Sequence, residues 1–210
     1  MKHLLLFLFF CTSAIAQEVN IAKDTIRMKE VVIKEDFRKF KDAKVKIKGD
    51  CRHPETMKDV PEVVTLIDNL PAGYLESVTF NFNEVHYQSY KSDRKKFEDT
   101  EFEVVLYKVN ADNTPGERIM KDEKYVKIMK EHTGEATVHF LEFNIKDHRK
   151  IFIGLKSTAG TRLNKEFYID CVCNSDKYKT FSRTDIKAPW NAYDTCPALK
   201  MEVNVLVSRK

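Results

Sequence analysis

The sequence predicts an all-β protein, built as a two-sheet antiparallel β-sandwich with an extended N-terminal segment. The first observation is in residues 75–109, where LESVTFNFNEVHYQ and FEVVLYKV are apolar with the periods of strands. The second is that strand-like runs recur along the chain and are separated by polar loops of very different lengths. The third is the lack of a helical period over three turns. Together these observations favour two sheets packed around one core.

The two strands within residues 75–109 differ in their apolar faces. In the first, Val78 and Phe80 alternate with polar residues, and the apolar phase then shifts, which predicts a β-bulge near Asn83 and Glu84. In the second, residues 102–109 are apolar on both faces, which predicts a strand in the middle of a sheet. We interpret the charged connection between them as solvated, with a basic ligand-binding patch as the alternative.

Residues 1–16 have the features of a signal peptide. Lys2 provides a basic start, residues 4–10 are apolar, and the small residues Ala14 and Ala16 form a cleavage site, so we expect cleavage after Ala16. Cys11 raises the alternative of a lipoprotein, but a lipid-modification site needs small residues before the cysteine, and two phenylalanines stand there. We therefore predict an exported chain, periplasmic or associated with the outer membrane.

Charge argues against a nucleic-acid partner, and hydropathy argues against a membrane-spanning helix. Removal of Lys2 with the signal peptide reduces 36 basic residues to 35 against 32 acidic ones, a formal net charge of +3. This balance does not predict a nucleic-acid partner. A membrane-spanning helix needs about 20 apolar residues in a row, and no later stretch has them, so we expect no membrane-spanning segment after signal cleavage.

Four cysteines remain after signal cleavage: Cys51, Cys171, Cys173 and Cys196. An even number in an exported chain predicts disulfide bonds, with three possible pairings. Cys171 and Cys173 share one face of a predicted strand, where neighbours two apart are separated by about 6 to 7 Å, near the upper limit for a disulfide. We therefore expect one of them to pair with Cys51 and the other with Cys196. A zinc site is the alternative, but Cys-x-Cys without a nearby histidine or second pair fits it poorly.

Residues 17–40 form an extended segment before the sandwich. Within it, DTIRMKEVVI at residues 24–33 resembles the L-x-E-V-V-V segment that leads into the plug of TonB-dependent outer-membrane receptors, often after a carboxypeptidase-regulatory-like domain. The resemblance covers this short segment and extends to neither that domain nor the barrel. It implies a partner at the outer membrane, with Val31, Val32 and Ile33 as the strand that pairs with it. The alternative is an edge strand of the sandwich itself.

Within residues 43–67, AKVKIKG predicts a strand, CRHPETMKD a polar loop and VPEVVTLI a second strand. Pro61 opens the second strand, where a missing N–H is tolerated. A tight reversal follows, because Pro71 presets φ for a turn and Gly73 can adopt a positive φ.

Turn chemistry also marks residues 110–120, where Asn113 and Gly116 predict a loop before the next strand. The order of a strand, D-N-x-P-G and a second strand is similar to that of secreted jelly-roll-like domains of Gram-negative surface systems. This resemblance covers residues 63–207 and implies a jelly-roll-like sandwich without implying an activity. Asp112 permits a calcium site as an alternative, but the loop shows fewer than the six or more oxygen ligands that calcium takes.

The remaining apolar runs complete the sandwich. Strands are expected at residues 125–129, 138–145 with a phase change, 151–155, 167–173 and 199–207. The continuous run IFIGL predicts a central strand. We expect residues 41–210 to form a single β-sandwich domain, since this length can bury a core.

No motif predicts catalysis, and no metal site or cofactor is expected. The histidines after the signal peptide stand singly, without HExxH spacing, and no Gly-x-Ser-x-Gly is present. They are His53, His86, His132, His139 and His148. His139 alternates with Val138 and Phe140, which places it on the polar face of its strand. A hydrolytic carboxylate pair is the alternative, drawn from Glu76, Glu84, Glu101 and Glu103, but its geometry cannot be derived from sequence.

Residues 174–195 form the candidate binding loop. A connection this long in a compact domain is typical of functional loops, and it carries the only tryptophan of the chain. Exposed aromatic rings beside polar groups would form a platform for a sugar or a protein. The candidate residues are Tyr178, Arg183, Trp190, Asn191, Tyr193 and Asp194. The alternative is that Trp190 folds inward and caps the end of the sandwich.

Two functions follow from these observations. The first is a non-enzymatic interaction module, an accessory subunit that binds another protein of the outer membrane or periplasm. The second is a carbohydrate-binding module that uses residues 174–195 to bind a glycan. We expect Trp190→Ala to weaken binding more than folding.

Overall fold

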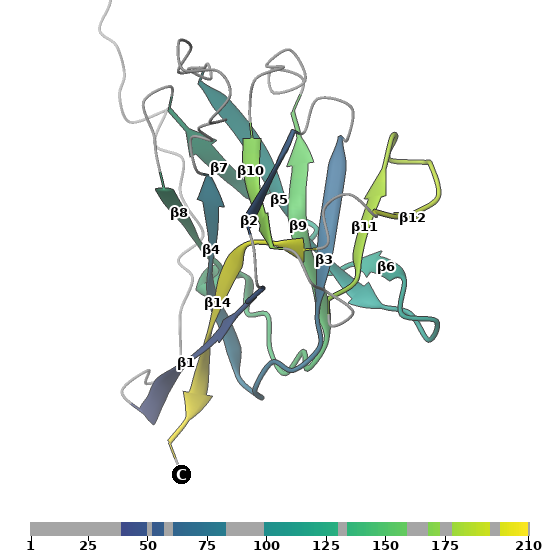
Figure 1. The fold of residues 1–210 in the computed structure, drawn as a ribbon. Coiled ribbons are helices and arrows are strands. Elements are labelled where there is room, and N and C mark those ends of the chain that lie inside the picture. The colour runs from purple at the N-terminus through teal and green to yellow at the C-terminus, as the bar shows by residue number, and fades with distance from the viewer. Residues whose placement is uncertain are drawn as a thin grey trace, which may run out of the picture. The chain divides into compact units, whose positions relative to one another are not determined.

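The computed structural model describes residues 39–49, 52–56, 61–82, 99–129, 134–158, 168–172, 178–193 and 198–209. These residues form strands β1 to β14 and the 3₁₀ helix η2 (Figure 1). The strands are β1 (Phe40–Lys46), β2 (Arg52–Thr56), β3 (Glu62–Ile67), β4 (Tyr74–Phe82), β5 (Thr100–Val109), β6 (Pro115–Arg118), β7 (Tyr125–Ile128), β8 (Gly134–His139), β9 (Ile151–Ser157), β10 (Tyr168–Val172), β11 (Thr180–Arg183), β12 (Asn191–Ala192), β13 (Ala198–Leu199) and β14 (Met201–Ser208), and η2 spans Leu141–Phe143.

The strands pair antiparallel in three sheets. One has the order β1-β14-β4-β8, the second β13-β10-β2, and the third β12-β11-β3-β9-β5-β6, with β7 also paired to β5. Only Lys200 separates β13 from β14, and β10 contacts β4, so the first two sheets form one layer. The third sheet forms the other layer.

The main core lies between the two layers. Val78 of β4 and Val203 of β14 are fully buried in the same cluster as Leu106 of β5 and Ile153 of β9. The rings of Phe82 and Phe102 stack with centroids 6.0 Å apart and an interplanar angle of 13°, which joins β4 to β5. The predicted all-β antiparallel sandwich is therefore confirmed.

The large sheet is buried on both faces. Successive side chains of a strand point to opposite faces, yet every residue of β3 is buried. One face packs in the main core, and the other carries a second apolar cluster of Val64, Leu66, Val105, Tyr107 and Phe152. Burial of both faces explains why these strands read as continuous apolar runs. The predicted central positions of residues 102–109 and 151–155 are confirmed, since β5 and β9 both lie inside the sheet.

Two glycines are required where backbones approach closely. A Cβ on Gly154 would lie 1.9 Å from the carbonyl oxygen of Val63 on the neighbouring strand. Gly73, in the predicted reversal, has φ +157°, and a Cβ there would lie 2.1 Å from the carbonyl oxygen of Leu206. Neither position can accept a side chain without moving a paired strand.

Some local predictions were wrong. Residues 141–143 form η2 in place of a continued strand, because Asn144 adopts a left-handed φ of 52° and its N–H bonds the carbonyl of Leu141. The polar stretch expected as a loop contains β2, which pairs with β10. The expected last strand at residues 199–207 is observed as β13 and β14, and the pairing of β14 with β4 shifts in register between Asn204 and Val205.

The edge strand β1 begins at Phe40, one residue before the expected start of the domain. The Phe40 ring contacts Tyr74 edge-on with centroids 5.6 Å apart. Lys44 and Lys46 both pair with Glu202 of β14, at 2.9 and 2.5 Å. Lysines on an edge strand disfavour accidental pairing with another strand, since such pairing would bury their charge.

Several sequence predictions concern residues outside the described ranges. They are the signal peptide at residues 1–16, the extended segment through residue 38 with Val31, Val32 and Ile33, the bulge at Asn83 and Glu84, the cysteines Cys51, Cys173 and Cys196, the histidines His53, His86 and His132 as side chains, and Asp194.

Candidate functional site: the β11–β12 hairpin

Half of the candidate loop is a β-hairpin rather than an irregular connection. Phe181 pairs with Ala192, and Ser182 pairs with Asn191. β11 also pairs along β3, where the hydroxyl groups of Thr180 and Thr65 are 3.0 Å apart. The hairpin therefore extends the large sheet at its edge.

The turn between the two strands is ordered by its own backbone bonds. The carboxylate of Asp185 accepts the N–H of Lys187 at 2.9 Å, as in an Asx turn. The carbonyl of Asp185 accepts the N–H of Ala188 at 3.0 Å. These bonds hold the backbone on either side of Ile186 in one conformation.

Arg183 holds the turn to the sheet beneath it. Its Nε donates to Oε2 of Glu62 at 2.6 Å, and its Nη1 donates to the carbonyl of Ile186 at 2.7 Å. A third bond runs from Nη2 to the hydroxyl of Tyr107 at 2.8 Å. The planar guanidinium thus connects β11, β3, β5 and the turn.

Tyr107 completes this cluster from β5. Its hydroxyl donates to Oε1 of Glu62 at 2.5 Å. Burial raises the pKa of the Tyr107 phenol well above its ordinary value, and the bond to Glu62 raises it further. The phenol is therefore neutral at neutral pH and acts as a hydrogen-bond donor to the carboxylate.

Trp190 packs on the same cluster. The Arg183 guanidinium lies over the indole ring, 4.3 Å from its centroid, and the Tyr107 ring meets it edge-on with centroids 5.3 Å apart. The indole is half-buried. Arg183 therefore occupies one face of the ring that a stacked sugar would need.

The cluster belongs to a row of alternating charges across the large sheet. Register places Arg183 opposite Glu62, Glu62 opposite Lys156, and Lys156 opposite Glu103. Lys156 donates to Oε2 of Glu103 at 2.5 Å, and Arg118 bonds the other oxygen. Both buried carboxylates thus have cationic partners, which is how a protein accommodates buried charge. Chemically, the row neutralises charge inside the sheet, and its ion pairs link β11 to β3, β9 to β5 and β6 to β5.

The other predicted site residues lie elsewhere. Tyr178 and Tyr193 pack against the main core, and the Tyr178 hydroxyl accepts the backbone N–H of Lys48 at 3.2 Å. Asn191 is exposed on β12 and donates to the carbonyl of Pro189 at 3.4 Å. The structure therefore brings together Arg183 and Trp190 but not all of the expected platform.

Sequence reasoning missed Glu62 and Tyr107 as partners of Arg183. The available signal was a lone carboxylate in each apolar strand, Glu62 in EVVTLI and Glu103 in FEVVLY. A buried carboxylate requires a partner, so each of these two glutamates could have indicated that a cation lies beside it. His139, by contrast, is exposed on β8, as its alternation predicted.

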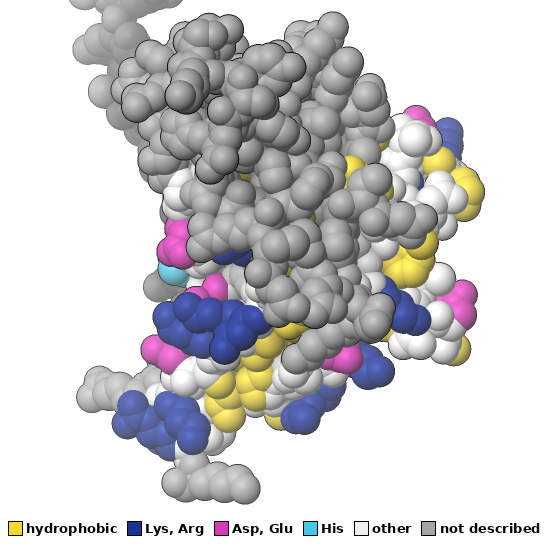
Figure 2. Space-filling model, viewed as in Figure 1, with side chains coloured by type: hydrophobic (Ala, Val, Ile, Leu, Met, Phe, Trp, Pro, Cys, Tyr) yellow, Lys and Arg dark blue, Asp and Glu magenta, His cyan; other side chains and the backbone are white. Residues whose placement is uncertain are grey.

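The outer part of the hairpin is open to solvent. The Ile186 side chain is 55% exposed at the turn, beside the exposed residues Asp185, Lys187 and Pro189. In the space-filling view, hydrophobic side chains reach the surface next to acidic and basic groups on the side where Figure 1 places β11 and β12 (Figure 2). A large apolar side chain is thus presented on a rigidly supported turn.

Cys171 is fully buried on β10. Cys51, Cys173 and Cys196 lie outside the described residues. The expected pairing of Cys171 and Cys173 with Cys51 and Cys196 therefore stays a prediction.

The chain matches no protein-family model, no curated protein and no solved structure. Within the described ranges, no group of three or more His, Cys, Asp or Glu side chains is placed to hold a metal ion. In that same part of the chain, no helix is long and apolar enough to cross a membrane.

Proposed function

We propose that this chain is an exported, non-enzymatic interaction module that binds another protein of the outer membrane or periplasm through the β11–β12 hairpin. The observation that carries the proposal is the exposed Ile186 on a turn that Arg183 ties to the sheet. A preorganised turn loses little conformational entropy on binding. The complementary partner has an apolar pocket with charged groups at its rim, which meet Asp185 and Lys187.

The N-terminal sequence supports the proposed location. The signal-peptide features of residues 1–16 and the even number of cysteines that follow are typical of exported proteins. Residues 24–33, which resemble the segment before a TonB-dependent receptor plug, would add a second contact by strand pairing. The hairpin and this segment would then bind the same outer-membrane complex.

Carbohydrate binding remains the alternative function. It requires an accessible face of Trp190, and the Arg183 guanidinium occupies one face of this ring. Because Trp190 is the only tryptophan, its fluorescence reports directly on a bound glycan. Saturable quenching by envelope glycans would favour the alternative.

The decisive experiment is site-specific photocrosslinking in cells that express the full chain. A photoreactive residue at Lys187 should form a discrete adduct with one envelope protein, which mass spectrometry identifies. Ile186→Glu should reduce the adduct at least tenfold, since a charge would enter an apolar pocket. Met129→Glu is the matched control, because Met129 is 56% exposed and lies after β7. An adduct that survives Ile186→Glu would contradict binding through the hairpin.

A further inference from the structure

β1 is an edge strand of its sheet within the part of the chain that the structure describes (Figure 1). Among the described strands it lies at the end of the order β1-β14-β4-β8, and it pairs there with β14 alone. An edge strand offers a row of backbone N–H and C=O groups to another strand. The direction of these groups, and the charge beside them, decide what can pair with β1.

Backbone hydrogen bonds beyond the two ends of β1 show which residues bond β14. The N–H of Ile47 bonds the carbonyl of Met201 at 3.0 Å, and the N–H of Arg209 bonds the carbonyl of Lys39 at 2.8 Å. In an antiparallel pair, residues that bond the neighbouring strand alternate with residues whose N–H and C=O groups point away from it. The register between β1 and β14 runs without a shift. Every second residue of 39–47, starting from the first, therefore bonds β14.

The residues between them, Asp42, Lys44 and Lys46, direct their N–H and C=O groups to the open edge. Their side chains are exposed and share the outer face of the sheet, because alternate residues of a strand point to the same side. Lys44 and Lys46 share the single carboxylate of Glu202, at 2.9 and 2.5 Å. Two positive charges on this face thus meet one negative charge.

The opposite face of the same edge is apolar at its centre. Ala43 and Val45 are half-buried, and Val45 packs against the main core. Lys41 is exposed and makes no ion pair with the described residues. In Figure 2, hydrophobic side chains reach the surface beside basic ones on the side where Figure 1 places β1 and β14. A strand added at this edge would cover apolar side chains with one face and meet lysines with the other.

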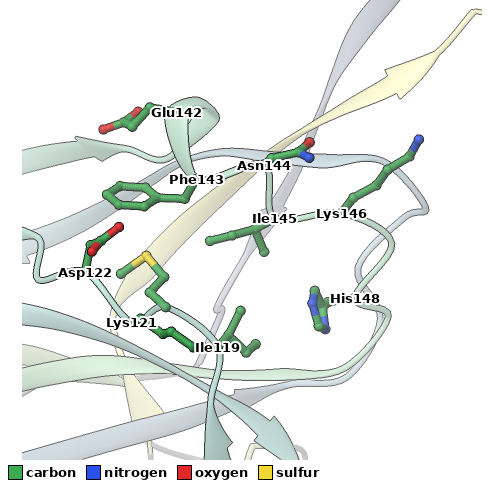
Figure 3. A pocket seen from close by; sticks show the side chains of 10 residues that line it. Ile119, Lys121, Asp122, Glu142, Phe143, Asn144, Ile145, Lys146 and His148 are labelled. Atoms are coloured by element: carbon green, nitrogen blue, oxygen red, sulfur yellow. The ribbon is translucent and has the colours of Figure 1, made fainter. Parts of the chain in front are cut away.

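The first residue of β1 is covered by the protein's own side chains. The Phe40 ring contacts Tyr74, and the Lys146 ammonium lies over the Tyr74 ring, 4.7 Å from its centroid. In the close view of the neighbouring pocket (Figure 3), the Lys146 side chain points away from Ile145, which also lines that pocket. The edge that is open to a partner therefore extends over residues 41–46.

Charge restricts the strands that can pair with this edge. Residues 39–48 contain five lysines and one aspartate. An apolar strand would bury these charges, and a second copy of β1 would bring two basic strands together. A strand with acidic side chains opposite the lysines would instead form opposite-charge pairs across the two strands. The lysines therefore reject most strands and favour an acidic one.

We propose that the open edge of β1 binds an extended acidic segment of a partner protein by strand addition. The segment places acidic residues opposite Lys44 and Lys46, apolar residues opposite Ala43 and Val45, and a basic residue opposite Asp42. Its backbone completes the row of hydrogen bonds at the edge, and its apolar face extends the main core. β1 and the β11–β12 hairpin belong to different sheets, so this inference does not rest on the function proposed for the hairpin.

Amide hydrogen exchange of the full mature chain, resolved by NMR, tests the proposal. The probe is the acetylated and amidated peptide EVEVKE, whose residues have the required pattern when they pair antiparallel with residues 41–46. Saturating peptide should slow exchange of the N–H groups of Asp42, Lys44 and Lys46 at least about tenfold, because each gains a hydrogen bond. The N–H of Val45 already bonds β14 and should change much less, so that protection alternates along β1.

Modified peptides separate backbone pairing from charge attraction. A methyl group on the third peptide nitrogen removes the N–H that faces Lys44 and should abolish the protection. A methyl group on the fourth nitrogen points away from β1 and should leave the protection in place. The peptide VVKEEE has the same composition and charge without the alternation, so it should not produce alternating protection.

A charge variant tests the selection of an acidic strand. Lys44→Gln should weaken binding of EVEVKE about two- to fivefold, the effect of one cross-strand charge pair. Lys121→Gln is the matched control, because Lys121 is exposed and lies outside β1. Uniform or absent protection, or equal binding of the two methylated peptides, would overturn the proposal. Protection of the Lys44 N–H that rises with protein concentration alone would also overturn it, since the edge would then belong to a second copy of the chain.

Discussion

Arg183 and Glu62 form a nearly buried ion pair between residues 121 positions apart, with Nε 2.6 Å from Oε2. Their side chains are 11% and 3% exposed. The pair joins the hairpin to the sheet, so its loss should affect both stability and the shape of the turn.

Removing Arg183 alone should be strongly destabilising. Arg183→Met leaves Glu62 buried without its cationic partner, and breaking a buried pair costs about 3 to 5 kcal/mol. The double variant Glu62→Gln, Arg183→Met should recover much of this loss, because it leaves no isolated charge. Urea unfolding of the two single variants and the double variant measures the coupling. Additive losses would show that the two residues do not act as a pair.

Trp190→Ala should lower the free energy of unfolding by about 1 to 3 kcal/mol, since it removes a half-buried ring and its contact with Arg183. An exposed ring would cost only about half a kcal/mol. The sequence alone predicts that Trp190→Ala weakens binding more than folding. The structure adds the expectation of a clear loss of stability. Trp190→Phe is the control, because it keeps an aromatic ring over Arg183. Thermal unfolding and partner crosslinking on the same variants separate the two effects.

Stability should fall at alkaline pH through Tyr107. Its folded pKa is raised above the unfolded value of about 10, so its stabilising effect is complete below that pH and is lost as the pH rises towards the folded pKa. Tyr107→Phe should cost about 1 to 3 kcal/mol near pH 8, and the difference from the parent should narrow above about pH 10. Urea titrations across this range test the effect. Parallel stability curves for the two proteins would contradict it.

Reduction should destabilise the fold by about 2 to 5 kcal/mol for each disulfide bond. Cys171 is fully buried on β10, where it lies opposite Leu199 of β13, so loss of a disulfide bond there would disturb the core. Peptide mapping of exported material should show four oxidised cysteines and identify the pairing. Detection of four free thiols would contradict the prediction.

A chain that starts at Lys39 should unfold like the parent and bind its envelope partner more weakly, because it keeps the hairpin and loses the second contact. It retains all of β1 and the bond from the Arg209 N–H to the Lys39 carbonyl, at 2.8 Å. A chain that starts at Asp42 is the comparison, because it loses the contact of Phe40 with Tyr74 and should be less stable by about 1 to 3 kcal/mol. Partner binding of unchanged strength in the Lys39 form would remove residues 24–33 from the proposed contact.

The sequence alone determined the class of fold and the burial of single strands. Strand side chains alternate between faces, so the continuous apolar run of β9 was sufficient to predict a central position. The same reasoning placed His139 on a polar face. It failed at residues 141–143, where the left-handed Asn144 ends the strand pattern, because apolar spacing does not report a single φ angle.

Only the tertiary structure decided what Arg183 and Trp190 contact. Their partners Glu62 and Tyr107 come from β3 and β5, which are distant in sequence, and cross-strand register brings them together. Local periodicity specifies which face a residue occupies, but it does not specify which strand lies beside it. For that reason the composition of residues 174–195 left open whether Trp190 is exposed or folds inward, whereas the structure packs the half-buried indole against Arg183, which is paired with Glu62.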